Sequence, residues 1–200
     1  MIMKKIIIPV FLLFLFEISA ISIKSGNARP EFIGIEACRK CHDSTSIGSQ
    51  HKIWAATPHA KAFQTLLTEE GQTAGKKYNI EQPSKDVKCL SCHATGSGKN
   101  PKIVSEGVGC EACHGPGSLY NDFDNHASFD NRENAYRKAT LLGMYPIIGD
   151  DSIKAREKLC RHCHNEKRLC ITRDDLTKND KKELPLSIIA DFIYIHPLRR

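Results

Sequence analysis

The stretch Cys110-Glu111-Ala112-Cys113-His114 carries the pattern C-x-x-C-H, which occurs four times in this chain of 200 residues. The other copies are Cys38-Arg39-Lys40-Cys41-His42, Cys89-Leu90-Ser91-Cys92-His93 and Cys160-Arg161-His162-Cys163-His164. With 9 Cys and 9 His in the sequence, chance predicts about 0.02 copies. The repeated pentapeptide therefore decides what kind of protein this is.

C-x-x-C-H is the attachment signature of a c-type haem. The two thiols bond to the haem and the imidazole ligates its iron. Positions i, i+3 and i+4 share one face of a helix, so we expect each motif on a helical turn. We predict four covalently bound haems c. Their attachment residues are Cys38, Cys41, Cys89, Cys92, Cys110, Cys113, Cys160 and Cys163, and their proximal ligands are His42, His93, His114 and His164.

C-x-x-C pairs have other uses. Four of them could build two Cys₄ zinc sites, and single pairs serve as thiol-disulfide centres or structural disulfides. None of these alternatives explains the histidine that follows every pair. The ninth cysteine, Cys170, is predicted to be a small buried hydrophobe rather than a functional thiol.

Five histidines remain as candidates for the opposite faces of the irons: His51, His59, His126, His162 and His196. His162 lies inside the fourth motif and should point away from its own haem, and His51 is expected at the surface. His59, His126 and His196 are therefore the predicted distal ligands, against the alternative of surface or hydrogen-bonded histidines. Three ligands for four irons leave one haem five-coordinate or with a weaker ligand. Met144 is the only Met after residue 20, so ligation by one His and one Met could serve at most one haem.

The N-terminus resembles a secretory signal. Lys4 and Lys5 precede an apolar run over 6–16, and Ile18-Ser19-Ala20 offers a cleavage point. We expect residues 1–20 to be a signal peptide, 21–35 a linker and 36–200 a tetrahaem domain in the periplasm. The alternative is an uncleaved N-terminal anchor.

The composition is poor in residues that form a core. Aromatic residues make up 7%, there is one Trp, and mean hydropathy is −0.36. Four porphyrins would supply much of the missing apolar interior. The formal charge of +6 is largely offset by haem propionates, so nucleic-acid binding is not expected.

The sequence predicts a mainly α fold, a small helical multihaem cytochrome whose core is formed by the haems. Helices are expected over 46–56, from Thr57 through the stripe His59, Phe63 and Leu66, over 130–142 with a capping box, and from about 151 into the fourth motif. Glycines make 94–109 a loop, which should bring the second and third haems close together. Segment 171–184 is charged and 184–196 is apolar.

Three runs carry a family resemblance: Trp54-Ala-Ala-Thr-Pro-His59-Ala-Lys-Ala-Phe63, CLSCHATG over 89–96 and GVGCEACHGPGS over 107–118. They resemble the tetrahaem cytochrome c-554 family from about residue 36 to 164. The resemblance implies four closely packed haems, three of them bis-His and one open. It implies that His126 ligates the first haem, His59 the third and His196 the fourth, and that His93 serves the open haem. Relatives often carry a His where this chain has Leu119-Tyr120.

The expected function is periplasmic electron transfer through the haems, with no catalytic residues. The resemblance implies a hydroxylamine oxidoreductase-like multihaem enzyme as donor, and we expect a membrane quinone-linked or soluble cytochrome as acceptor. The main alternative is an enzyme that reduces nitric oxide or another small N-oxide at the open haem. A further alternative is a subunit of a larger multihaem complex that docks through 171–200.

Overall fold

The computed structural model describes residues 28–127, 131–149 and 152–165. The proposed signal peptide, Cys170, His196 and the two C-terminal segments lie outside these residues. The described part contains helices and turns and no strand, which confirms the mainly α fold. None of its helices is long and apolar enough to cross a bilayer. The α-helices are α1 (Ile35–His42), α2 (Gln50–Ala55), α3 (Ala62–Thr65), α4 (Glu69–Lys77), α5 (Val87–His93), α6 (Cys110–His114), α7 (Phe123–His126), α8 (Arg132–Leu141) and α9 (Ile153–Cys163).

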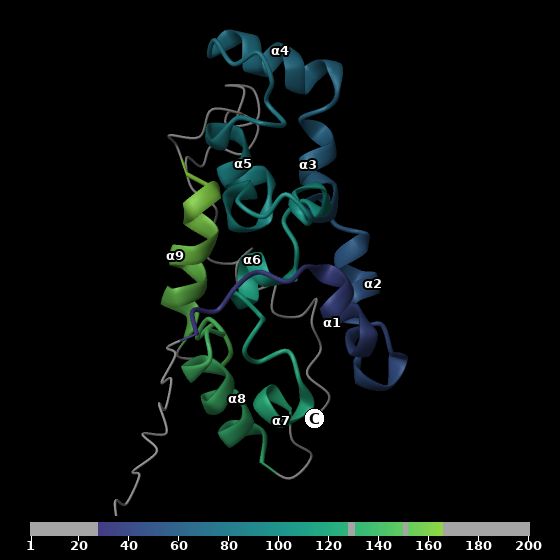
Figure 1. The fold of residues 1–200 in the computed structure, drawn as a ribbon, viewed down its shortest axis with the longest axis vertical. Helices are drawn as coiled ribbons and strands as arrows, with labels where there is room; N and C mark the ends of the chain where they lie inside the picture. The colour runs from purple at the N-terminus through teal and green to yellow at the C-terminus, as the bar shows by residue number, and fades with distance from the viewer. Residues whose placement is uncertain (1–27, 128–130, 150–151, 166–200) are drawn as a thin grey trace, which may run out of the picture.

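All four C-x-x-C-H motifs lie on helices, as predicted: the first on α1, the second on α5, the third on α6 and the fourth at the end of α9. In Figure 1, α5 and α6 lie between α9 on one side and α1, α2 and α3 on the other. Contacts of α5 with α3 and α9, and of α6 with α1, agree with this arrangement. The motifs from distant parts of the sequence thus meet around the two middle helices.

The predicted helix over 46–56 is divided in the structure. A 3₁₀ turn, η1 (Thr45–Ile47), is followed by left-handed backbone at Gly48 (φ 108°) and Ser49 (φ 51°) before α2 begins. Glycine adopts this conformation without strain, so the chain reverses there. Helix α2 ends at Ala55, ahead of Pro58 as predicted.

The segment after Thr57 starts with a 3₁₀ turn, η2 (Pro58–Lys61), and continues as α3. Phe63 and Leu66 pack with Leu90 and Ala94 in a small apolar cluster, which confirms the predicted apolar stripe. The loop over 94–109 contains two further 3₁₀ turns, η3 (Thr95–Gly98) and η4 (Val104–Glu106), and packs against both α5 and α6.

The predicted capping box of Asp130 and Glu133 would make Asp130 the N-cap of α8, but the helix begins one residue later. The side chain of Asn131 accepts the N–H of Asn134 at 2.9 Å, so Asn131 is the N-cap, whereas Asp130 lies outside the described residues. The helix stops before Gly143, whose φ of 113° suits only glycine. Helix α9 then runs directly into the fourth motif, as predicted.

Large buried side chains are few among the described residues. Among the buried aliphatic residues, Leu66 and Leu90 pack in one small cluster, whereas Ile35, Ile80 and Ile103 lie in other parts of the chain. Leu141 and Val87 are 84% and 62% exposed. This shortage of apolar packing is what a protein would show if flat apolar cofactors completed its interior.

Candidate haem-binding centre

Each motif presents two thiols from one helical turn. Seven of the eight cysteines are half-buried and Cys41 is exposed. The thiols are free, so none of the motif pairs forms a disulfide. Their positions on α1, α5, α6 and α9 fit the attachment of one porphyrin to each helix.

Thiols from different motifs touch one another. Cys38 of the first motif hydrogen-bonds with Cys110 of the third, and Cys92 of the second hydrogen-bonds with Cys163 of the fourth. The hydrogen bond with Cys163 lowers the pKa of the Cys92 thiol to about 6 and raises that of Cys163. These thiols titrate only before haem attachment, because thioethers carry no proton. The contacts link the first motif to the third and the second to the fourth, a pairing that sequence spacing did not predict.

The first candidate ligand pair joins α1 to α7. The ring centres of His42 and His126 lie 6.1 Å apart, with an interplanar angle of 32°. Two metal–nitrogen bonds of about 2.0 Å, with about 1.1 Å from each nitrogen to its ring centre, require about 6.2 Å. The separation would allow both imidazoles to ligate one iron. It also agrees with the expectation that His126 serves the first haem.

The second pair joins η2 to the fourth motif. The ring centres of His59 and His164 lie 5.9 Å apart at an interplanar angle of 83°. This separation fits the same arithmetic. The resemblance assigned His59 to the third haem, whereas the structure places its ring beside the proximal histidine of the fourth. Sequence spacing cannot reveal this pairing, because about a hundred residues separate the two positions.

Hydrogen bonds fix the ring orientation of several candidate ligands. The Nδ1 atom of His126 lies 2.7 Å from the carbonyl of Asp122, and that of His93 lies 2.7 Å from the carbonyl of Ala62. A carbonyl can only accept, so each Nδ1 carries the proton and each Nε2 carries the lone pair that a metal needs. His42 Nδ1 lies 3.3 Å from the Gln50 side-chain oxygen. Burial lowers the pKa of His42 and of His59, which favours the neutral, ligating form.

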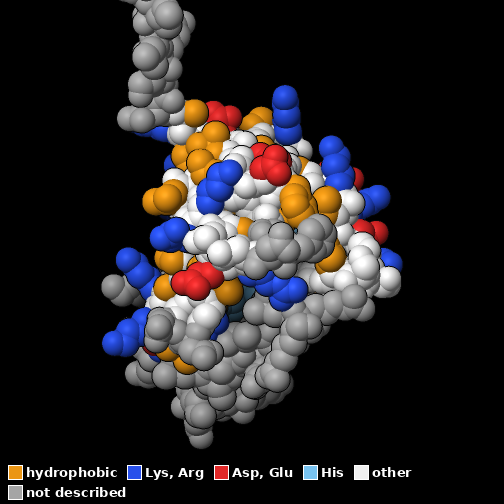
Figure 2. Space-filling view, turned by 90° about the horizontal axis from the view of Figure 1, so that it is seen from below, with side chains coloured by type: hydrophobic (Ala, Val, Ile, Leu, Met, Phe, Trp, Pro, Cys, Tyr) orange, Lys and Arg blue, Asp and Glu red, His pale blue; other side chains and the backbone are white. Residues whose placement is uncertain are grey.

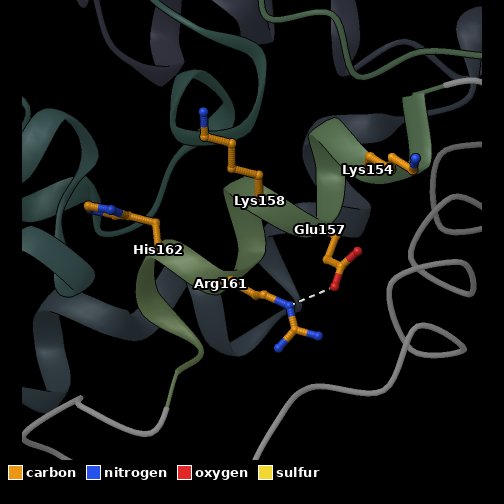
Figure 3. Close-up of a pocket in the computed structure, with 5 residues that line it drawn as sticks. All are labelled: Lys154, Glu157, Lys158, Arg161 and His162. Carbon is orange, nitrogen blue, oxygen red and sulfur yellow. Dashed lines mark hydrogen bonds and ion pairs between the residues drawn. The ribbon is translucent and has the colours of Figure 1, made fainter.

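Two histidines outside the predicted ligand set have different surroundings. His51 was expected at the surface, but its side chain is only 18% exposed and pairs with Asp43 at 3.0 Å. The reversal at Gly48 brings the two together, and Asp43 thereby has its pKa lowered by the His51 hydrogen bond. His162 is exposed, and it lines a surface hollow of about 590 Å³ on α9 with Lys154, Glu157, Lys158 and Arg161 (Figure 3).

Two buried polar residues at the third motif were not predicted from the sequence. Tyr120 donates its hydroxyl to the carbonyls of Gly115 (2.8 Å) and His114 (3.1 Å), and its ring packs edge-on against His126. Burial raises the pKa of that hydroxyl. Glu111, inside the motif itself, is 2% exposed. The only available signal was the position of both residues within or beside a motif.

The zinc alternative was also compared with the positions of the described side chains. The described residues contain no group of three or more His, Cys, Asp or Glu side chains arranged to hold a metal ion.

Half-buried thiol pairs on helices, followed by histidines with oriented rings, define a helical protein of the c-type cytochrome class. A family model described as cytochrome c554 and c-prime matches residues 37–115, a segment that contains the first three motifs. This match confirms the resemblance to the cytochrome c554 family and implies covalently bound c-type haem. Comparison with curated proteins and with solved structures found no match.

Proposed function

We propose that this protein carries electrons in the periplasm through four covalently bound haems c. The family supports a haem-based electron-transfer role. The observation that carries the finer proposal is the pair of histidine–histidine separations, 6.1 and 5.9 Å, each joining a motif histidine to a residue from elsewhere in the chain. When bound, each haem supplies one-electron exchange between ferric and ferrous iron.

The chain's own residues hold and saturate the irons. The eight motif cysteines anchor the four groups, and the four motif histidines ligate on the proximal side. His126 would ligate the first haem together with His42, and His59 would ligate the fourth together with His164. His196 would then ligate the third haem, whereas the resemblance assigned it to the fourth. An iron with an imidazole on both faces has no position for a substrate, so such a site transfers electrons without bond chemistry.

Close packing of the motifs supports a conduction path. The contacts of Cys38 with Cys110 and of Cys92 with Cys163 give each haem a neighbour from a distant motif. We propose that electrons enter from a hydroxylamine oxidoreductase-like multihaem enzyme. They leave to a membrane quinone-linked or soluble cytochrome. Export by residues 1–20 would place the protein where haem c is attached.

The test is intact mass spectrometry of denatured protein from its native host, followed by electron paramagnetic resonance of the oxidised native protein. We expect a mass increase equal to four haems and mainly low-spin ferric signals. A polypeptide mass without added haem contradicts the proposal outright. Fewer than four haems would show that one motif, such as the fourth outside the family match, is not used.

A second candidate function is the reduction of nitric oxide or a related N-oxide at the haem of His93. The observation in its favour is the hydrogen bond from His93 Nδ1 to the Ala62 carbonyl, at 2.7 Å. A strong acceptor there makes the imidazole a more electron-donating ligand, as suits an iron that activates a bound molecule. Adding nitric oxide to the oxidised protein tests this function by electron paramagnetic resonance. Low-spin signals that the gas leaves unchanged contradict it, and a high-spin component that reacts with the gas supports it.

A further inference from the structure

A buried carboxylate lies inside the third motif. Glu111 is 2% exposed and accepts backbone N–H groups from Ile33 (3.0 Å to each oxygen), Gly34 (2.7 Å) and Gly117 (2.7 Å). These donors are neutral, and no Lys or Arg in the described residues forms an ion pair with Glu111. Charge-assisted hydrogen bonds hold the carboxylate in place without cancelling its charge.

A second carboxylate lies nearby. Glu106 accepts the N–H of Ile35 at 2.9 Å, at the start of α1. Burial raises the pKa of Glu106, and the negative charge of Glu111 raises it further. Two acidic side chains thus hold the N-terminal end of the helix that carries the first motif.

The position of Glu111 relates it to two haem attachment sites. It directly follows Cys110 of the third motif, and Cys110 touches Cys38 of the first. Glu111 lies on α6, and it accepts the N–H of Gly34, the residue directly before α1, so it lies between the two helices that carry these motifs. Its electric field therefore reaches the anchor points of both motifs.

We propose that Glu111 is a fixed negative charge that lowers the reduction potentials of the first and third haems. The inference rests on the proposed attachment of haem at both motifs. Reduction adds one electron to ferric iron and cancels one positive charge, and no proton or bond change is required. A nearby anion stabilises the more positive ferric form, so it weakens the tendency of these haems to accept an electron. Electrons are thereby directed toward the second and fourth haems.

The experiment is a spectroelectrochemical titration of the haem-loaded protein, with each haem followed by its electron paramagnetic resonance signal. Glu111→Gln removes the charge at nearly constant shape. We expect the equilibrium constant for reduction of one or two haems to rise about tenfold, which is about 59 mV for a one-electron couple. Glu111→Asp keeps the charge and should shift the constants less than threefold.

The matched control is Glu36→Gln. Glu36 also lies on α1, but its side chain is 74% exposed and pairs with Arg39 at 3.1 Å. Water screens such a charge, so we expect less than a twofold change. Equal shifts in Glu111→Gln and Glu36→Gln would overturn the proposal, because a specific buried charge would then not be the cause.

Other outcomes separate the possible failures. Unchanged potentials in a fully loaded Glu111→Gln protein overturn the inference and leave electron transfer standing. Equal shifts in Glu111→Gln and Glu111→Asp also overturn it, because they assign the effect to altered packing. If Glu111→Gln does not take up haem, Glu106→Gln is the second variant: a smaller rise in the same haems supports the inference and no rise contradicts it. A wild-type protein without haem refutes the proposed function instead.

Discussion

Gly34 offers the sharpest test of how the N-terminal segment packs against the third motif. Its φ of 90° and ψ of 168° lie in a region that only glycine occupies readily. Its N–H donates to Glu111 at 2.7 Å. A Cβ added there would lie 2.7 Å from Ile103 Cγ2 and 2.9 Å from Glu106 Oε1. The substitution Gly34→Ala therefore combines backbone strain with a steric clash.

Two terms give the size of the effect. Backbone strain in this region costs about 1–3 kcal/mol. Overpacking against a buried side chain adds about 1–3 kcal/mol. Gly149 separates the two terms, because its φ is 93° but a Cβ there would meet nothing within 4 Å. We expect strain alone to lower the free energy of unfolding of Gly149→Ala, and strain and clash together to lower that of Gly34→Ala. The two variants should therefore differ by about 1–3 kcal/mol.

The assay is denaturant unfolding of the haem-loaded protein, followed by circular dichroism in the helical and haem absorption bands. The two variants are compared with the wild type at one pH and salt concentration. Equal destabilisation by Gly34→Ala and Gly149→Ala would refute the close approach of Gly34 to Ile103 and Glu106. It would also remove the geometric basis for a rigid Glu111 at the third motif.

The remaining predictions address the ligands, the charges and the cofactor count. His126→Ala should convert one low-spin haem to a high-spin signal that added imidazole restores, while His51→Ala leaves the spin states unchanged; two unchanged spectra would contradict the His42 pairing. Because burial raises the pKa of Glu106 in the folded state, its contribution to stability is lost as pH rises from about 4.5 through that pKa. Glu106→Gln should flatten this slope in the unfolding free energy, and parallel pH profiles would refute it. Replacing Cys160 and Cys163 by Ala should lower the intact mass by one haem, whereas an unchanged haem mass would show that the fourth motif holds none.

Local features of the fold could be predicted from the sequence. A C-x-x-C-H motif specifies a single helical turn, so its assignment to a helix requires no knowledge of the rest of the chain. The stop of α2 before Pro58 and of α8 before Gly143 follow from the backbone limits of one residue each. The break at Gly48 was missed because an isolated glycine in a helical pattern also occurs within intact helices.

The distal side of the site could be predicted only in part. Elimination identified His59 and His126 as candidate ligands, because few histidines remained once the motifs were removed. The partner of His59 depends on how η2 meets α9, a long-range packing choice that no local pattern encodes. His51 was misplaced for the same reason, since its contact with Asp43 exists only after the chain reverses. Glu111 carries no sequence signal that separates a buried carboxylate from an exposed one.

Three of the helices that carry the motifs are too short to be stable on their own. Helices α1, α5 and α6 have 8, 7 and 5 residues, well below the length of about 12–15 at which isolated helices become marginally stable in water. The described residues offer them one small apolar cluster around Leu66 and Leu90. Covalent attachment of haem would bind each of these turns to a large apolar surface, which would replace the side-chain packing they lack. The buried Glu111 and the partly buried Glu106 then add the polar specificity that a porphyrin cannot supply: they fix the N-terminal segment against the third motif through directional hydrogen bonds.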